Sequence, residues 1–299
     1  MSTAAPSKHL AARQPMQPLQ STSFPLRSPA LLTTPSQPPA SASQTTPAES
    51  RRPSVRAAWY WENRKAPNRW YWAAVTVLCT MACLSGYLQY RTHQGDFQSQ
   101  DLTWGIIWSQ STLMLSMWLL PLALGGFAAQ IAVGEHQGRN WQRMSANRLE
   151  TAMVAGKLLH GLQVAVATTA ILVLTTTLTG LMAGFGLPDL TSYLPRFVAV
   201  ALGMWVILTL VTWLGAVLRS FTTTMTTVVL GTIAGTAMFL TAQPLSVLNP
   251  MTALTRATAS LNPGAIASAD SAASDSLISV AWVTLFALAL LRTVKTAVR

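Results

Sequence analysis

The stretch FVAVALGMWVILTLVTWLGAVL, from Phe197 to Leu218, contains no aspartate, glutamate, lysine or arginine. An α-helix rises about 1.5 Å per residue, so roughly 20 such residues cross a hydrocarbon core of ~30 Å. Soluble domains carry about a quarter charged residues, whereas this chain is 10% charged and 51% hydrophobic. The stretch is therefore predicted to be a transmembrane helix.

Five further uncharged apolar runs predict an all-α, polytopic membrane protein with six transmembrane helices. The second run is too long for a simple crossing, so it must tilt, bend near Pro121 or project beyond the bilayer. The last is short and needs Arg292 and Lys295 to extend their charged ends to the interface. The six predicted spans are approximately 71–90, 104–133, 158–183, 197–218, 221–242 and 277–291.

The formal net charge of +11 follows this topology. All of the 20 lysines and arginines except Arg91, Arg196 and Arg256 lie before the first span, between spans two and three, between spans four and five, or after span six. Basic residues near span ends resist translocation. This bias predicts a cell-membrane protein with both termini cytoplasmic, and it explains the charge without a nucleic-acid partner.

The first 56 residues differ in composition from the rest of the chain. They are rich in Pro, Ser, Thr, Ala and Gln and show no sustained helical or strand period, which predicts a disordered cytoplasmic tail. No apolar core of a signal peptide appears before residue 70. Residues 57–299 are predicted to form the transmembrane domain.

Two aromatic clusters surround a basic cluster just before the first span. Trp and Tyr favour the headgroup layer, and Arg and Lys suit an anionic inner leaflet. Residues 57–65 are therefore predicted to form an interfacial helix on the membrane lipid, turning at Pro67 into the first span. The candidate interfacial anchors are Trp59, Trp61, Arg64, Lys65, Trp70 and Trp72.

Pairs of glycines four residues apart occur in two of the predicted spans. Small residues let helix backbones approach closely in lipid. Gly180 and Gly184 are candidates for helix packing in the third span, as are Gly231 and Gly235 in the fifth, inside one bundle or between subunits. Between spans five and six, the two Asn-Pro pairs in residues 243–276 predict short helices at the outer leaflet.

The chain lacks the sequence signatures of enzyme chemistry. Cys79 and Cys83 lie four apart in one span, where helical geometry disfavours a disulfide. The four histidines show no zinc spacing, and Gly156-Lys157 lacks the remainder of a phosphate-binding loop. We therefore expect no cofactor, no metal and no ATP site in this chain. Because the predicted spans carry no charge, energy is expected to enter from a separate partner through a cytoplasmic loop.

The loop GEHQGRNWQRMSANRLETAMVAGK, Gly134 to Lys157, is the candidate for that role. Residues 136–145 predict a short amphipathic helix, with Trp141 and Met144 facing apolar surroundings. Arg139 and Arg143 would then face water or a partner.

A second helix is predicted to follow directly after this one. Asn147 resembles an N-cap and Glu150 the third residue of a capping box. The helix would begin at Arg148 and continue into the third span.

These residues resemble the permease subunits of ABC-2 type ATP-binding-cassette exporters. Such permeases carry an acidic residue, a glycine, an aromatic and basic positions before a lysine that enters span three. The matching residues are Glu135, Gly138, Trp141, Arg148 and Lys157. The Glu-x5-Trp spacing is similar to the lantibiotic and bacteriocin immunity subgroup, although Asn147-Arg148 occupies the region where many members have a proline.

The resemblance implies a six-span permease without its own ATP site, exporting an amphipathic or hydrophobic compound such as a peptide antibiotic. It implies a separate ABC ATPase and a second permease chain, identical or different. Coupling to the ATPase would fall to Glu135, Gly138, Trp141, Arg143 and Arg148. Two alternatives stay open: an ion-coupled secondary transporter, and a non-transporting membrane scaffold or sensor that acts through its tail.

Overall fold

The computed structural model describes residues 54–65, 69–99, 104–188 and 190–296. By its internal contacts the chain divides into residues 1–50 and 51–299, and the described residues all belong to the second unit. The predicted turn at Pro67 and the predicted tail, except its last three residues, lie outside the described residues. The boundary at residue 56 stays a prediction. Every regular element in the described ranges is a helix, which confirms the all-α class.

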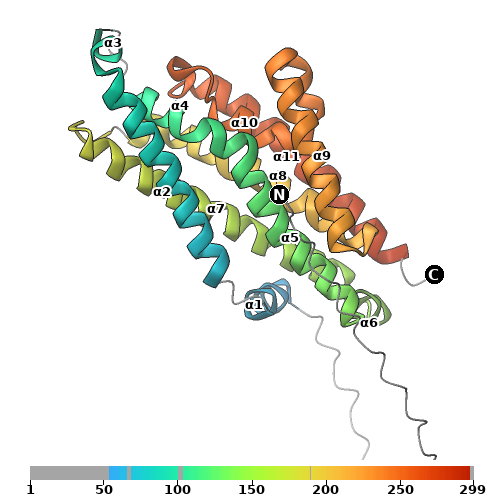
Figure 1. Ribbon diagram of the computed structural model, residues 1–299. Helices are drawn as coiled ribbons and strands as arrows, with labels where there is room; N and C mark the ends of the chain where they lie inside the picture. The colour runs from blue at the N-terminus through green and yellow to red at the C-terminus, as the bar shows by residue number, and fades with distance from the viewer. Residues whose placement is uncertain (1–53, 66–68, 100–103, 189, 297–299) are drawn as a thin grey trace, which may run out of the picture. The chain divides into compact units, whose positions relative to one another are not determined.

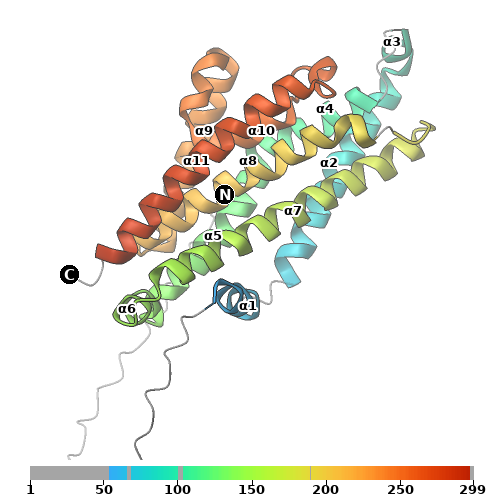
Figure 2. The ribbon, with the colours of Figure 1, turned by 180° about the vertical axis from the view of Figure 1, so that it is seen from behind.

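Six helical segments are long and apolar enough to cross a membrane, as predicted. Successive segments run in alternating directions, so α1 and α6 lie at one end of the bundle and α10 lies at the other (Figure 1, Figure 2). We call these the α6 end and the α10 end. The six segments are α2 (Arg69–Thr92), α4 to α5 (Trp104–Gln137), α7 (Glu150–Met182), α8 (Leu190–Leu218), α9 (Phe221–Thr241) and α11 (Ala269–Thr296).

The fourth span, α8, forms the centre of the bundle. It contacts α5, α7, α10 and α11, and Val200, Met204, Ile207 and Val211 have no exposed surface. Their spacing of three or four residues places them along one side of the helix. By contrast, apolar side chains such as Leu230 on α9 point outward, 61% exposed. An apolar outer surface suits a bundle surrounded by lipid.

The second span is continuous but contains a π-helical turn. Regular helix α4 (Trp104–Met114) passes through η1 (Leu115–Leu119) into α5 (Leu120–Gln137). At this turn the backbone N–H of Leu120 donates to the carbonyl of Leu115, five residues back. Pro121 has no N–H, and its ring crowds the preceding turn. The wider π-turn accommodates that ring, so the irregularity falls next to Pro121. A bend near this residue was one of the three alternatives that the sequence left open for the second span.

The helix that contains the last predicted span, residues 277–291, is longer than that span. Helix α11 covers Ala269–Thr296, because its first turns are polar and nevertheless packed. Asp275 is buried and forms ion pairs with Arg196 and Arg256. Asp275 interrupts the uncharged run on which the prediction was based. It does not interrupt the helix, because its charge is paired.

The connection between α9 and α11 consists of short helices, as predicted. Each of the three 3₁₀ turns has a proline at its start, in keeping with the preference of proline for the first turn. Their place relative to the leaflet stays a prediction. The elements are η2 (Gln243–Leu248), η3 (Pro250–Thr252), α10 (Ala253–Thr258) and η4 (Pro263–Ala265), and the short α3 (Gln94–Ser99) follows α2 at the same end of the bundle.

The four candidate packing glycines occupy different environments. A Cβ added to Gly180 would overlap the ring of Trp104, so α7 and α4 approach closely there. The prediction for Gly184 was wrong, because it lies after the end of α7 with φ 86° and no neighbour for a side chain. It occupies the left-handed position that often follows a helix. Gly231 and Gly235 lie against Met251, Thr252 and Asn249 of the same chain, inside one bundle.

Candidate functional site

The first helix, α1 (Val55–Lys65), crosses the α6 end of α7 at close range. A Cβ added to Gly156 of α7 would lie 2.8 Å from the Cβ of Ala58 in α1. The sequence predicted an interfacial helix over nearly the same residues. Its contact with α7 brings Glu62, with 4% of its surface exposed, into the bundle.

Four charged side chains from three helices meet beneath α1, and we call them the charge ring. Lys157 of α7 donates to Glu62 Oε2 at 2.9 Å and to Glu135 Oε1 of α5 at 2.8 Å. Lys65 donates to Glu62 Oε1 at 3.0 Å and to the same Glu135 oxygen at 3.0 Å. The ring contains two acids and two bases, so it is neutral as a whole.

Burial makes the charge ring sensitive to the loss of any member. The side chains of Lys157, Glu62 and Glu135 are each 4% exposed, and removing one partner of a buried pair typically costs about 3–5 kcal/mol. Burial alone would lower the pKa of Lys65, but attraction to Glu62 and Glu135 outweighs it and raises the pKa. The stability that Lys65 contributes is therefore present at neutral pH and is lost only as the pH rises through this raised pKa.

Among the described residues at this end of the bundle, two polar groups are buried without a hydrogen-bond partner. They are Glu135 Oε2 and the imidazole of His160, of which neither nitrogen is bonded. His160 lies one turn beyond Lys157 on α7, with its ring centroid 6.1 Å from that of Phe127. Buried polar groups are nearly always hydrogen-bonded. Glu135 Oε2 and the His160 nitrogens can therefore form further hydrogen bonds, either after a rearrangement of the bundle or with a small polar molecule.

Helix α5 connects to α7 through a tight elbow around α6 (Asn140–Ala146). Arg139 before α6 and Arg148 after it adopt left-handed conformations, with φ 52° and 55°. Such values are uncommon for residues other than glycine. They turn the chain sharply at both ends of a two-turn helix.

The predicted cap of the third span was wrong in position. Helix α7 begins at Glu150 after Leu149, without a side-chain cap bond. The Asn147 side chain instead donates to the carbonyl of Arg143 at 2.7 Å, at the end of α6. The left-handed Arg148 separates the two helices, and Asn147 therefore ends one helix and does not begin the next.

Trp141 of α6 is inserted into the end of the bundle. It is 4% exposed, and its Nε1 donates to the carbonyl of Ala132 at 3.3 Å. Lys157 Nζ lies 5.3 Å from the ring centroid, a favourable geometry for a cation–π contact. Through these contacts α6 touches both α5 and the charge ring. The apolar neighbours of Trp141 in the same cluster are Met153, Val154, Ala216, Leu290 and Val294.

The five predicted coupling residues fall into two groups. Glu135 and Trp141 are buried, whereas Gly138, Arg143 and Arg148 are exposed. Only the exposed three are accessible to a partner in this conformation. The buried two connect α6 to the rest of the bundle. The sequence predicted this difference for Trp141 and Arg143, and it did not predict that Glu135 is buried.

A groove of about 770 Å³ adjoins the elbow. The imidazole of His136 lies 3.1 Å from the carbonyl of Gly215 and joins the end of α5 to α8. Arg219, between α8 and α9, has φ 57°. No acidic residue lines the groove among the described residues, so it is basic. Its polar lining residues are His136, Arg139, Gln142, Arg219, Thr293 and Thr296.

The predicted interfacial anchors surround α1 and the start of α2. Trp61 and Trp70 are 56% and 88% exposed, and Arg64 lies 5.8 Å from the ring centroid of Tyr60. Trp59 donates from Nε1 to Gln163 of α7 at 2.9 Å, and Trp72 is half-buried against the core.

Lys65 also has a role inside the bundle. Its ammonium points into the charge ring, because two carboxylates lie within 3.0 Å of it. Its role as a membrane anchor stays a prediction.

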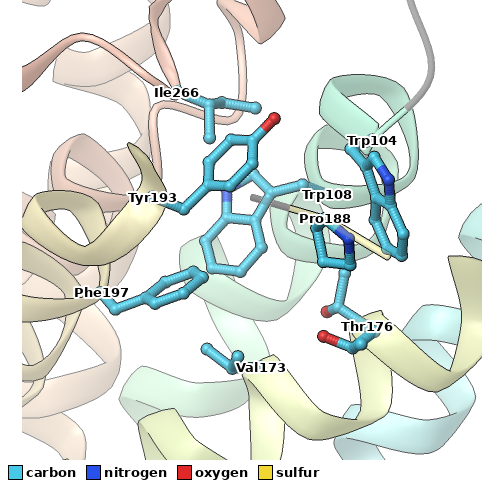
Figure 3. A pocket seen from close by; sticks show the side chains of 9 residues that line it. Trp104, Trp108, Val173, Thr176, Pro188, Tyr193, Phe197 and Ile266 are labelled. Carbon is cyan, nitrogen blue, oxygen red and sulfur yellow. The ribbon is translucent and has the colours of Figure 1, made fainter. Parts of the chain in front are cut away.

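An aromatic cavity lies towards the α10 end, between α4, α7 and α8 (Figure 3). Trp104, Trp108, Tyr193 and Phe197 point towards one another around it. Its volume is about 30 Å³, room for no more than one or two waters. A drug-sized compound needs roughly ten times more, so this cavity is closed in the present conformation.

The described residues contain no group of three or more His, Cys, Asp or Glu side chains placed to hold a metal ion. Cys79 and Cys83 are both buried and free, as expected for a helical i, i+4 pair.

Sequence reasoning missed Glu62 and the pairing of Lys157 with Glu135. A signal for both was present. Glu135 and Lys157 flank the loop between adjacent spans, and Glu62 is three residues before Lys65. Opposite charges at facing helix ends are expected to pair when the ends are buried.

The fold defines a multi-pass helical membrane protein. The family model described as "ABC-2 family transporter protein" matches residues 64–256, more than half of the chain. The chain therefore belongs to this family of ABC-2 type permeases. Searches among curated proteins and among solved structures found no match.

Proposed function

We propose that the chain is the membrane-spanning permease subunit of an ATP-driven exporter in the cell membrane. Membership of the ABC-2 family supports this role. The sequence lacks a phosphate-binding loop, so ATP hydrolysis is assigned to a separate ABC ATPase. The basic residues at the α6 end support a cytoplasmic location for that end and for both termini.

The observation that carries the proposal is the linkage of the elbow to α1, α7, α8 and α11. Through Lys157 and Lys65, Glu135 at the end of α5 is bonded to α7 and α1. Trp141 packs α6 against α7, α8 and α11. A force applied to the elbow would therefore move several spans together, because closely packed elements shift as rigid bodies.

The docking surface for the ATPase is assigned to the exposed side of α6 and the adjoining basic groove. Arg139, Gln142 and Arg143 are exposed, and Arg139 and Gln142 also line the groove. A partner with acidic side chains would complement this surface. Gly138 and Arg148 belong to the same surface, while Glu135 and Trp141 transmit its movement.

An amphipathic or hydrophobic compound is the proposed substrate class, with a peptide antibiotic as one example. Support comes from the aromatic cavity of Trp104, Trp108, Tyr193 and Phe197, whose lining is almost entirely apolar. Movement of α7 relative to α4 and α8 would enlarge it. Two permease chains, identical or different, would then complete the pathway.

One observation favours an ion-coupled transporter as a second candidate. Among the described residues, His160 and one oxygen of the ion-paired Glu135 are buried without a hydrogen-bond partner, and ionisable groups inside a membrane bundle mark proton pathways. An ion-coupled protein would work in vesicles without an ATPase. It would stop when the ion gradient is collapsed.

Affinity purification of the full-length chain from mild detergent tests the proposal. We expect a soluble ABC ATPase to be recovered with it, and an Arg139→Glu, Arg143→Glu variant to lose that partner. A Trp70→Ala variant, altered at an exposed tryptophan of α2, is the control and should retain it. Consistent absence of an ATPase from the wild-type preparation would overturn the proposal.

A further inference from the structure

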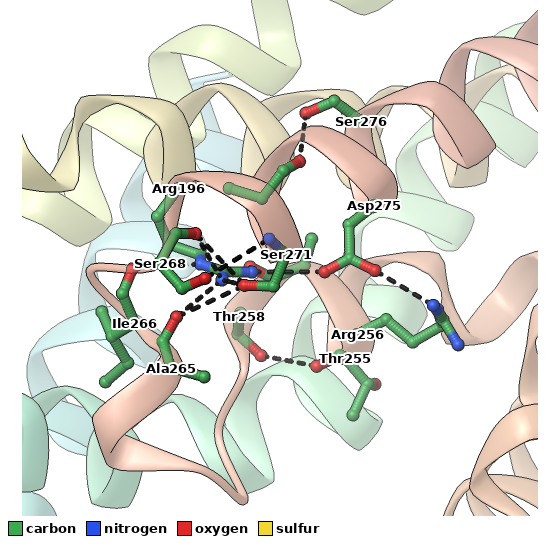
Figure 4. A network of polar contacts seen from close by, with 12 residues as sticks. Arg196, Thr255, Arg256, Thr258, Ala265, Ile266, Ser268, Ser271, Asp275 and Ser276 are labelled. Atoms are coloured by element: carbon green, nitrogen blue, oxygen red, sulfur yellow. Dashed lines mark hydrogen bonds and ion pairs between the residues drawn. The ribbon is translucent and has the colours of Figure 1, made fainter.

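A second cluster of charged residues lies at the α10 end, and we call it the arginine network (Figure 4). Asp275 of α11 accepts from Arg196 Nη1 at 3.2 Å through Oδ2, and from Arg256 Nη2 at 3.1 Å through Oδ1. One carboxylate thus serves two guanidinium groups. The network carries one positive charge in excess.

All three side-chain nitrogens of Arg196 donate hydrogen bonds within the protein. Its side chain is 1% exposed, and the acceptors lie in the connection before α11 or in α11 itself. Its bond to Asp275 already neutralises that carboxylate. The other acceptors are the carbonyls of Ala257, Ala265, Ile266 and Ser268 and the hydroxyl of Ser271.

Arg256 uses only some of its N–H donors in hydrogen bonds within the protein. A guanidinium has five N–H donors, and Arg256 engages Asp275 and, at 3.4 Å, the hydroxyl of Ser246. Its side chain is 18% exposed, and it lines a cavity of about 240 Å³. The free N–H donors of Arg256 and the excess positive charge of the network therefore both lie at this cavity.

The remaining lining of this cavity suits a small anion. The side chains of Gln243 and Asn262 carry amide donors, and Ser274 adds a hydroxyl. Asp275, already bonded by two arginines, is the only carboxylate among the lining residues. Asp270 is exposed and does not line the cavity. A guanidinium with free donors beside neutral donors is typical of carboxylate or phosphate recognition.

We propose that the cavity at Arg256 binds one anionic group, a carboxylate or a phosphate. Arg256 supplies the charge, and Gln243, Asn262 and Ser274 supply further donors. Arg196 and Asp275 hold the site in place through α8 and α11. The group belongs to a phospholipid headgroup or to a soluble compound that reaches the α10 end. The site does not depend on the assignment of an ATPase partner.

The test is thermal unfolding of the purified full-length chain in neutral detergent, at constant ionic strength. Sodium phosphate, sodium acetate and phosphatidylglycerol are titrated separately, with phosphatidylcholine as the uncharged-headgroup control. We expect at least one anion to raise the unfolding temperature, and Arg256→Gln to need about tenfold more of it, as for the loss of one charge-assisted bond. A response to phosphate or acetate indicates a soluble source, and a response to phosphatidylglycerol alone indicates a lipid.

Two further variants keep the test independent of misfolding. Arg91→Gln removes an exposed arginine of α2, which contacts Tyr87 and does not line the cavity, so it should respond as the wild type does. Ser274→Asp places a carboxylate beside Arg256 and should raise the unfolding temperature without added anion while removing the response. A wild-type chain that responds to none of the three probes, or an Arg256→Gln chain that responds like the wild type, would overturn the site.

Discussion

The charge ring at the α6 end and the arginine network at the α10 end both compensate buried carboxylates, but with different residues. The ring balances two carboxylates with two lysines, yet it leaves Glu135 Oε2 without a donor. The network gives one carboxylate two arginines, and Arg196 bonds mainly to backbone carbonyls. The ring thus depends on side chains from three helices, whereas the network is largely held by backbone.

This difference indicates different mechanical roles. The lysine ammonium is a compact charge on a flexible stem, and the guanidinium is a rigid planar fork. A lysine-based ring can re-form as α1, α5 and α7 shift. The arginine network fixes the short helices against α8 and α11. We therefore expect the charge ring to exchange bonds when the spans move and the bonds of the arginine network to stay the same.

The largest effect is expected from breaking the ring with Lys157→Met. Both Glu62 and Glu135 lose a buried partner, which should cost about 3–5 kcal/mol of unfolding free energy. Denaturant titration of the purified protein measures this loss. Lys157→Arg keeps a cation between Glu62 and Glu135 and should retain more of the stability than Lys157→Met. Wild-type stability in Lys157→Met would contradict the role of the ring.

A smaller loss is expected from Asp275→Asn in the network. Arg196 keeps its carbonyl acceptors and Arg256 is partly exposed, so we expect about 1.5–3 kcal/mol, the range for one charged hydrogen bond. The same titration gives the comparison. If this variant were less stable than Lys157→Met, the contrast between the two clusters would be reversed.

The contact between α1 and α7 is tested by Gly156→Ala. The new Cβ would lie 2.8 Å from the Cβ of Ala58, and overpacking of this kind costs about 1–3 kcal/mol. Displacement of α1 should also increase the reactivity of a cysteine placed at Glu62. Gly126→Ala in α5 is the matched control, because no atom lies within 4 Å of its added Cβ, and it should be neutral or stabilising.

The smallest change in the free energy of unfolding is expected from His160→Leu, and it is a gain where the other variants show losses. Neither imidazole nitrogen has a partner, so the apolar replacement loses no hydrogen bond and removes a buried polar group. We expect a gain of about 1 kcal/mol. A marked loss of stability would show that His160 bonds to a buried water or to another group at this position.

Apolar runs were sufficient to predict the six spans because lipid-facing and core-facing residues of a membrane helix are both apolar. The ends of the helices were harder to predict. Asp275 is buried in α11, where Arg196, 79 positions away, and Arg256 compensate its charge. Such pairs depend on tertiary structure, and a search along the chain does not reveal them.

The candidate site was predictable in part. The apolar side of α6 was correctly assigned to Trp141 and Met144, since their spacing follows the helical period. The left-handed turns at Arg139 and Arg148 were not predicted, because arginine rarely adopts that conformation. The partnership of Glu62 with Lys157 joins residues 95 apart, and only the crossing of α1 over α7 brings them together.

The most direct test of the central claim measures whether nucleotide-driven movement reaches the α10 end through Trp141. Spin labels at Leu187 and Leu248, 82% and 69% exposed, would report on that end in the complex with its ATPase in lipid nanodiscs, with Cys79 and Cys83 replaced by alanine. Trapping nucleotide with vanadate should shift the distance distribution in the wild type and in Trp70→Ala. In Trp141→Ala, ATP should still be hydrolysed while the distribution stays unchanged. A wild-type shift in Trp141→Ala would contradict the account.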